Sequence, residues 1–176
     1  MALGAALAAP SAWADQRDPR LDGLFVRLKT APDAATAAPV ATEIWRIWGE
    51  TPDETDAALM ARGIRAMNGG DAVTAGAAFD LLILRAPEFA EAWNKRATLR
   101  YLQDDDAGSV ADIRRTLALE PRHFGALSGL ALILERQERT EAALESLKAA
   151  LAINPFLPGG RERLDALAER AAGDPT

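Results

Sequence analysis

The sequence of 176 residues contains no cysteine and only one histidine, His123. Without cysteine the chain can form no disulfide framework, no cysteine-based zinc site and no thiol nucleophile. A single imidazole also excludes any site that needs two. Aromatic residues make up only 6% of the chain, whereas alanine occurs throughout it. Such a composition favours closely packed helices.

The chain also has fewer basic than acidic residues. The chain carries 20 Lys and Arg against 26 Asp and Glu, which gives a formal net charge of −6. Nucleic acids and anionic membranes are bound through a positive field, so neither is an expected partner. The share of hydrophobic residues, 49%, is that of a globular chain. We therefore expect one folded domain of ordinary size.

The segment that opens the chain, from Met1 to Ala14, carries no charge and ends in Ala12-Trp13-Ala14. The small residues Ala12 and Ala14 fit the A-x-A pattern that signal peptidase cleaves, and the apolar run is too short to span a bilayer. The basic residues that open a secretory signal are missing. Residues 1–14 are therefore interpreted as a truncated signal peptide of an exported, periplasmic protein. The alternative is an alanine-rich tail on a cytoplasmic protein.

A constant period organises most of the remaining chain. Pro87, Pro121 and Pro155 are each 34 positions apart, and each closes an apolar segment. Four other columns recur at this interval: Leu59, Trp93 and Leu127; Gly63, Ala97 and Ala131; Ala75, Ser109 and Ala143; and Phe79, Ile113 and Leu147. Each unit holds two apolar stripes at helical spacing, separated by a polar break. It therefore predicts two helices that approach closely through the small residues.

These columns resemble the signature of the tetratricopeptide repeat (TPR), which is W-x2-L-G-x2-Y followed by A-x3-F and then P. The resemblance covers three units: residues 56–89, 90–123 and 124–157. Arg62, Arg96 and Arg100 depart from the pattern, because the family usually has Leu or Tyr there. The resemblance implies an all-α fold, a right-handed α-solenoid of stacked antiparallel helix pairs. Together with the N-terminal segment it suggests a bacterial exported TPR protein.

The segments on either side of the repeats are expected to cap this stack. Residues 15–55 hold two amphipathic segments and resemble a degenerate repeat that shields the first full unit. Pro39 leaves the start of the second of these segments open. Residues 158–176 predict a C-terminal capping helix with a polar outer face, followed by a short tail.

No group of residues indicates an active site. Asp104, Asp105 and Asp106 form the densest acidic run, but they fall in a predicted turn, where Asp caps helices, and no EF-hand pattern surrounds them. His123 lies at the junction of two units and is interpreted as a surface or junction residue. We therefore expect a non-catalytic protein with no cofactor and no metal site. An enzyme that uses His123 or the acidic run is the disfavoured alternative.

A binding surface is expected on the concave side, because the first helix of each unit lines that side in stacked helix pairs. Twelve residues form it: Met60, Ile64, Met67, Asn68, Asn94, Thr98, Tyr101, Leu102, Ser128, Leu132, Glu135 and Arg136. The first unit is apolar there, which suits an adaptable contact, and the third is polar. Two interpretations stay open. The surface is either a groove for a peptide or helix of a partner, or it is covered by Trp45 and Trp48.

The leading functional prediction is a scaffold or adaptor that binds a partner protein or peptide on this concave surface. The alternative is a structural or self-associating subunit of a cell-envelope complex, assembled through exposed Trp45 and Trp48 or through the terminal cap. Lys29, Lys95 and Lys148 are the only lysines. The lysine clamp of the family members that bind chaperone tails is therefore not expected. No integral membrane span is predicted either.

Overall fold

The computed structural model describes residues 16–173, and its regular structure in that range is entirely helical. The helices of these residues are α1 (Arg20–Lys29), α2 (Ala34–Trp48), α3 (Glu54–Asn68), α4 (Ala72–Arg85), α5 (Ala90–Leu102), α6 (Asp106–Leu119), α7 (Phe124–Arg136), α8 (Thr140–Ile153) and α9 (Gly160–Gly173). The predicted all-α fold class is confirmed. Residues 1–14, interpreted above as a signal peptide, lie outside the described residues.

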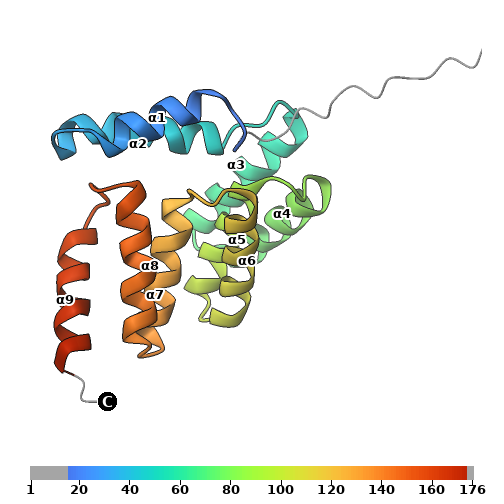
Figure 1. Cartoon of the computed structure of the whole chain (residues 1–176). Coiled ribbons are helices and arrows are strands. Elements are labelled where there is room, and N and C mark those ends of the chain that lie inside the picture. The colour runs from blue at the N-terminus through green and yellow to red at the C-terminus, as the bar shows by residue number, and fades with distance from the viewer. Residues whose placement is uncertain (1–15, 174–176) are drawn as a thin grey trace, which may run out of the picture.

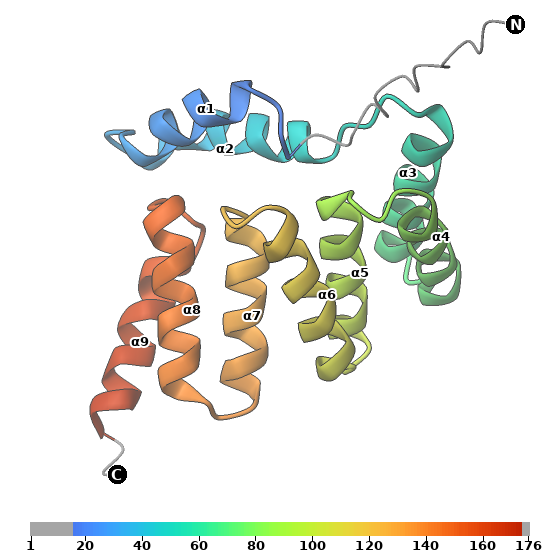
Figure 2. The same ribbon diagram turned by 45° about the vertical axis from the view of Figure 1, so that its right-hand side comes forward.

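Three helix pairs follow one another along the chain and stack side by side, as Figure 1 and Figure 2 show. Helix α3 packs on α4, α5 on α6, and α7 on α8. Neighbouring pairs meet through α4 with α5 and α6 with α7. Helix α9 packs on α8 through Leu167, which is fully buried. None of the helices between residues 16 and 173 has the length and hydropathy needed to cross a bilayer.

Aspartates determine where several helices begin. Asp53, Asp71 and Asp105 precede α3, α4 and α6, and each carboxylate accepts the backbone N–H three residues further on. These bonds satisfy donors that the first turn of a helix leaves without a partner. Asp33 caps α2 in the same way, so this helix begins five residues before Pro39 and contains it.

The turn inside each helix pair has the same backbone conformation in all three units. Gly70, Asp104 and Glu138 occupy equivalent positions of the repeat and have φ angles of 78°, 60° and 58°. This left-handed region suits glycine and is unfavourable for residues with a Cβ. The sequence period is thus repeated in the backbone, even where Asp or Glu replaces Gly.

The columns of small residues bring paired helices close together. A Cβ on Gly63 of α3 would lie 2.4 Å from Cε1 of Phe79, whose ring is fully buried on α4. In the next pair, Ser109 of α6 is buried and its Oγ donates to the carbonyl oxygen of Ala97 at 2.8 Å. Small side chains therefore serve both close packing and a hydrogen bond between helices.

Two of the arginines that depart from the TPR pattern are held by a buried carboxylate. Asp112 of α6 accepts hydrogen bonds from Arg96 at 2.8 and 2.9 Å and pairs with Arg100 at 3.0 Å. Arg96 also donates to Asp80 of α4 at 2.7 Å and lies over the ring of Trp93. Arg96 thus links the first helix pair to the second with a long polar side chain.

The N-terminal hairpin of α1 and α2 does not stack on the first unit. It lies across the ends of α7 and α8 (Figures 1 and 2), where its apolar side packs against Phe124, Ile153, Phe156 and Leu157. The expectation that residues 15–55 shield the first full unit is therefore wrong. The physical reason lies in the aromatic side chains of α2, which find their partners at the start of α7.

Candidate functional site

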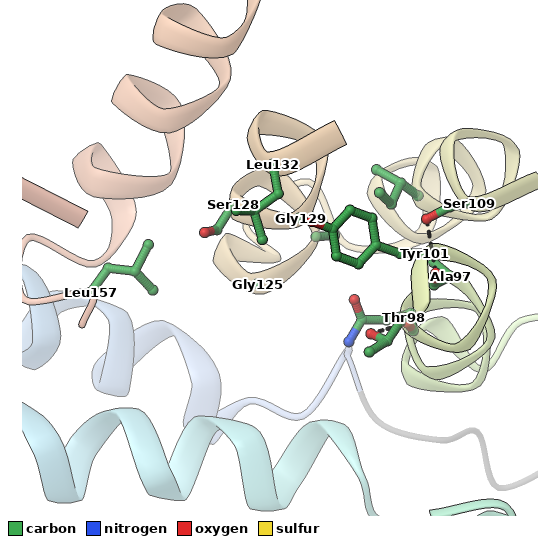
Figure 3. A pocket seen from close by; sticks show the side chains of 12 residues that line it. Ala97, Thr98, Tyr101, Ser109, Gly125, Ser128, Gly129, Leu132 and Leu157 are labelled. Carbon is green, nitrogen blue, oxygen red and sulfur yellow. Dashed lines mark hydrogen bonds between the residues drawn. The ribbon is translucent and has the colours of Figure 1, made fainter. Parts of the chain in front are cut away.

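A pocket of about 250 Å³ opens between α5 and α7 (Figure 3). Five of the twelve residues predicted for the concave surface line it: Asn94, Thr98, Tyr101, Ser128 and Leu132. The first three lie on α5 and the other two on α7. Equivalent positions of successive repeats, such as Thr98 and Leu132, therefore line the same pocket, as the repeat period predicts.

Glycines of α7 create much of this space. Gly125 and Gly129 lie one helical turn apart and both line the pocket. A Cβ on Gly129 would meet only Cδ1 of Ile113, at 3.8 Å, and the ring of Tyr101 reaches towards Gly129 from α5 (Figure 3). A Cβ on Gly125 would instead lie 2.3 Å from the ring of Trp45. The pocket could have been recognised in the sequence from these two glycines, because glycines four residues apart leave a gap on one face of an apolar helix.

The polar groups around the pocket are largely satisfied by the protein itself. Thr98 Oγ1 donates to the carbonyl oxygen of Asn94 at 3.0 Å, and Asn94 Nδ2 donates to Glu91 at 3.0 Å. The lining is consequently mostly apolar. Its volume is below the range of about 300–1,000 Å³ that is typical of small-molecule sites, and it suits one or two protruding side chains.

Five predicted surface residues belong to the first unit or to the end of α5, and none of them lines this pocket. Met60 is buried in the core that α3, α4 and α5 share, and Ile64 and Met67 are half-buried against it. Asn68 and Leu102 are exposed. The apolar side chains predicted as a binding surface in the first unit are thus largely used for packing.

The two predicted residues at the end of α7 are engaged in ion pairs. Glu135 accepts hydrogen bonds from Arg163 at 2.6 Å and from Arg170 at 3.4 Å, both on α9. Arg163 also donates to Ser128 Oγ at 3.3 Å. This part of the surface therefore attaches α9 to α7 beside the pocket.

Arg136 forms ion pairs with two residues of the acidic run. Its guanidinium pairs with Asp104 at 2.7 Å and with Asp106, and it lies 4.3 Å from the ring centroid of Tyr101. The hydrogen bonds from Arg136 hold the pKa of Asp106 below its ordinary value. The acidic run is thus divided between helix capping by Asp105 and ion pairs with Arg136. Within residues 16–173 no group of three or more His, Cys, Asp or Glu side chains is arranged to hold a metal ion.

An aromatic cluster of Trp45, Trp48, His123 and Phe124 joins the hairpin to the repeats. The imidazole of His123 stacks on Trp48 with ring centroids 4.1 Å apart and an interplanar angle of 10°. The Trp45 ring meets both His123 and Phe124 edge to face, each at a centroid distance of 5.3 Å. Such pairs add to the stabilisation that comes from burying the rings.

The position of these rings corrects one of the two interpretations of the concave surface. Trp45 and Trp48 do not fold over Met60 and Met67, which belong to a separate core with α3, α4 and α5. The hairpin nevertheless reaches one edge of the pocket, because Trp45 contacts Gly125.

His123 is fully buried at the start of α7 and bonds Glu91 of α5, so it is the junction residue of the earlier interpretation and not a surface residue. Its Nδ1 accepts the backbone N–H of Ala126 at 3.1 Å and caps α7. Its Nε2 therefore carries the proton and donates to Glu91 Oε2 at 2.9 Å. Both ring nitrogens are engaged within the protein, which leaves neither for a substrate.

Glu91 is the buried charge at the centre of this arrangement. Its carboxylate also accepts from Asn94 Nδ2 and pairs with Lys95 Nζ at 2.9 Å. Burial by itself raises the pKa of Glu91, but the hydrogen bond from His123 and the charge of Lys95 outweigh it. The pKa of Glu91 therefore lies below its ordinary value. The Glu91 network connects the aromatic cluster to Asn94 in the pocket wall.

Solved structures with similar folds include several TPR domains. The first TPR of Spaghetti (RPAP3), bound to an HSP90 peptide, matches with a TM-score of 0.64 and 16% identity over 68% of this chain and 94% of that one. The TPR2B domain of yeast Sti1 in its pHsp70 complex matches with a TM-score of 0.60 and 22% identity over 69% of this chain and 98% of that one. MamA matches with a TM-score of 0.62 and 16% identity over 84% of each chain. At these identities the similarity is one of fold.

Sequence comparison adds closer relatives, although no family model matches the chain. Tetratricopeptide repeat protein 36 of mouse is 41% identical over 66 residues, which are 38% of this chain and 36% of that protein. A TPR repeat-containing protein of Rhizobium etli is 36% identical over 157 residues, which are 89% of this chain and 77% of that protein. TPR proteins are typically non-catalytic and commonly bind peptides. By its similarity to the Rhizobium protein along most of both chains, this protein belongs to the TPR repeat-containing proteins.

Proposed function

We propose that this protein is a non-catalytic adaptor that binds a segment of a partner protein at the pocket between α5 and α7. The observation that carries the proposal is the pocket itself, which residues from equivalent positions of two successive repeats line together. A groove built from repeated positions suits an elongated ligand, because each repeat offers similar contacts at the next step along it.

The lining favours a segment that inserts an apolar side chain. Such a side chain would enter beside Gly129 and contact the ring of Tyr101 and Leu132. The TPR domains of Spaghetti and Sti1 named above were solved with chaperone-derived partners. The basic groups near this pocket are already paired, Lys95 with Glu91 and Arg163 with Glu135. We therefore propose apolar recognition rather than the capture of an acidic tail.

Replacing Gly129 with leucine is expected to weaken partner binding strongly. The new side chain would fill the pocket, and Leu has a higher helix propensity than Gly by up to about 1 kcal/mol, so the fold should persist. Affinity capture with tagged protein in its native cells, read by quantitative mass spectrometry, measures partner recovery. We expect at least about a tenfold loss, which corresponds to about 1.4 kcal/mol of binding free energy.

Gly23→Leu is the matched control for this experiment. Gly23 lies on the exposed side of α1, where no atom of residues 16–173 would come within 4 Å of a new Cβ. This variant should recover the same partners as the wild type. Equal recovery with Gly129→Leu and the wild type would refute the pocket as the binding site.

Self-association is the second candidate function, and an exposed apolar stripe on α4 favours it. Val73, Leu81 and Leu84 are 84%, 46% and 79% exposed and lie at helical spacing on one face. Trp48 is buried, Trp45 is half-buried, and both pack on His123, so α4 offers the more exposed apolar surface. Exposed apolar stripes of this kind are typical of protein interfaces.

If α4 mediates assembly, the wild type should gain mass with concentration in light scattering. The double variant Val73→Glu with Leu84→Glu should stay monomeric, because charges on the stripe oppose its burial. Both positions are exposed, so the fold of the variant should be unaffected. A wild type that stays monomeric at high concentration would exclude this function.

A location in the cell envelope is part of the adaptor proposal and rests on the A-x-A pattern at Ala12 and Ala14. It requires cleavage after Ala14. N-terminal sequencing of the protein from its own cells would find Asp15 as the first residue. An intact residue 1–14 segment would instead indicate the cytoplasmic alternative.

A further inference from the structure

The other face of α7 borders a second and larger hollow, of about 840 Å³, between α6 and α8. We call it the α6–α8 groove. Its floor is formed by Leu127, Leu130 and Leu134, which share one face of α7. Val110 of α6 and Ala142 of α8 form apolar walls, and charged side chains lie along the rim.

The preceding repeat shows what fills the corresponding space elsewhere in the chain. The residues one repeat before the three floor leucines are Trp93, Arg96 and Arg100. Arg96 extends between Asp80 of α4 and Asp112 of α6 and is hydrogen-bonded to both. The space between α4 and α6 is thus occupied by an Asp–Arg–Asp bridge that the chain supplies itself.

The α6–α8 groove lacks that bridge, because all three of its positions differ. Leu130 replaces the arginine, Arg114 stands in place of Asp80, and Ser146 in place of Asp112. Leucine is too short to cross the groove and has no charge. Arg114 is exposed and has no carboxylate partner among residues 16–173. The α6–α8 groove therefore has an apolar floor and a cation without a counter-charge, whereas Arg96 fills the equivalent space of the preceding repeat.

A second cation without a counter-charge lies at the start of α8. Arg139 lines the groove, is exposed, and forms no ion pair with any described residue. The acidic rim residues are different, because Asp106 is bound to Arg136 and Glu145 to Lys148. The uncompensated charge of the rim is therefore positive, although the whole chain carries −6.

We propose that the α6–α8 groove binds a short acidic amphipathic helix of a partner protein. Its apolar side chains would cover Leu127, Leu130 and Leu134, and its carboxylates would pair with Arg114 and Arg139. The floor leucines span eight residues of α7, a rise of roughly 10 Å, which matches about two turns of a docked helix. A helix in an apolar groove with charges at its rim is a common mode of recognition.

Fluorescence anisotropy with two designed peptides tests this proposal. Each fluorescein-labelled peptide has about 16 residues, or roughly four helical turns, with Leu on one face and either Glu or Lys on the other. The wild type should bind the Glu peptide at least about tenfold more tightly than the Lys peptide. This preference runs against the net charge of the protein, so a general electrostatic attraction cannot produce it.

Three variants locate the binding. Arg114→Glu should weaken binding of the Glu peptide about tenfold. Leu130→Arg combined with Ser146→Asp should abolish it, because this pair supplies two side chains of the internal bridge of the preceding repeat. Arg65→Glu, an exposed residue of α3 with the same change of charge, is the control and should have no effect.

Three results would overturn the proposal. The first is equal binding of the Glu and Lys peptides, and the second is an equal effect of Arg114→Glu and Arg65→Glu. The third is a wild-type dimer that Leu130→Arg with Ser146→Asp converts to a monomer in light scattering, which would assign the groove to a second copy of this chain. If the double variant fails to fold, the surface substitution Arg114→Glu decides by itself.

Discussion

Replacing Trp48 with alanine is expected to detach the α1–α2 hairpin while the three helix pairs stay folded. Trp48 is 2% exposed, and it stacks on His123 and packs on Phe25 and Phe124. Removing a buried Trp side chain costs about 3–5 kcal/mol. Trp48 Nε1 has no hydrogen-bond partner among the described residues, so the loss is one of packing alone.

Hydrogen exchange measured by mass spectrometry distinguishes local from global opening. In Trp48→Ala the amides of α1 and α2 should exchange fast, while those of α7 and α8 stay protected. The helix pairs should stay folded because their hydrophobic cores, one in α3–α5 and one in α7–α9, do not contain Trp45 or Trp48. Uniform loss of protection in all helices would contradict it. Trp93→Ala, which removes a half-buried Trp outside the hairpin, is the control and should leave α1 and α2 protected.

Replacing Glu91 with alanine is expected to destabilise the fold by about 3–5 kcal/mol, the range for breaking a buried ion pair. The substitution would leave His123 Nε2 and Asn94 Nδ2 without their acceptor in a buried site. The midpoint of urea denaturation, followed by circular dichroism, measures the loss. A shift no larger than that of Glu145→Ala, at an exposed residue that pairs with Lys148, would contradict this expectation.

The same residue predicts a pH dependence. Because the native pKa of Glu91 lies below the ordinary value of 4.5, its ionised form stabilises the fold above that pH. This stabilisation is lost as the pH falls through the native pKa, since both states are then protonated. The difference in unfolding free energy between the wild type and Glu91→Gln should therefore be largest near pH 7 and shrink below about pH 4.5. A difference that is constant over this range would contradict the assignment.

The helix pairs could be predicted because their limits depend on nearby residues. Helices α4, α6 and α8 each end two residues before Pro87, Pro121 and Pro155. These prolines lack the N–H that a continuing helix needs. The place of the hairpin could not be predicted in this way. The apolar face of α2 indicates that Trp48 is buried, but the periodicity does not identify the surface that covers it.

The lining residues of the candidate site that follow the repeat could be predicted. The space that glycine leaves beside them could not. Thr98 and Leu132 share a pocket because they occupy the same position in successive repeats. The space beside them depends on Gly129, and a hollow left by an absent side chain has no hydrophobic pattern of its own. Met60 does not belong to the concave surface, because α3 turns that face towards α5 and buries the side chain.

The hairpin contact also has a consequence for synthesis of the protein. Asp22 of α1 pairs with Arg122, 100 residues later, and the hairpin core includes Phe124. A ribosome adds about 5–20 residues per second, so α1 and α2 emerge roughly 5–20 s before the surface that covers them. During that interval α1 and α2 can pack on each other, but the side of the hairpin that packs on Phe124, with Trp48 on it, lacks its native partner. The newly made chain should therefore be a client of the chaperones that shield emerging apolar segments, although the finished protein buries this surface.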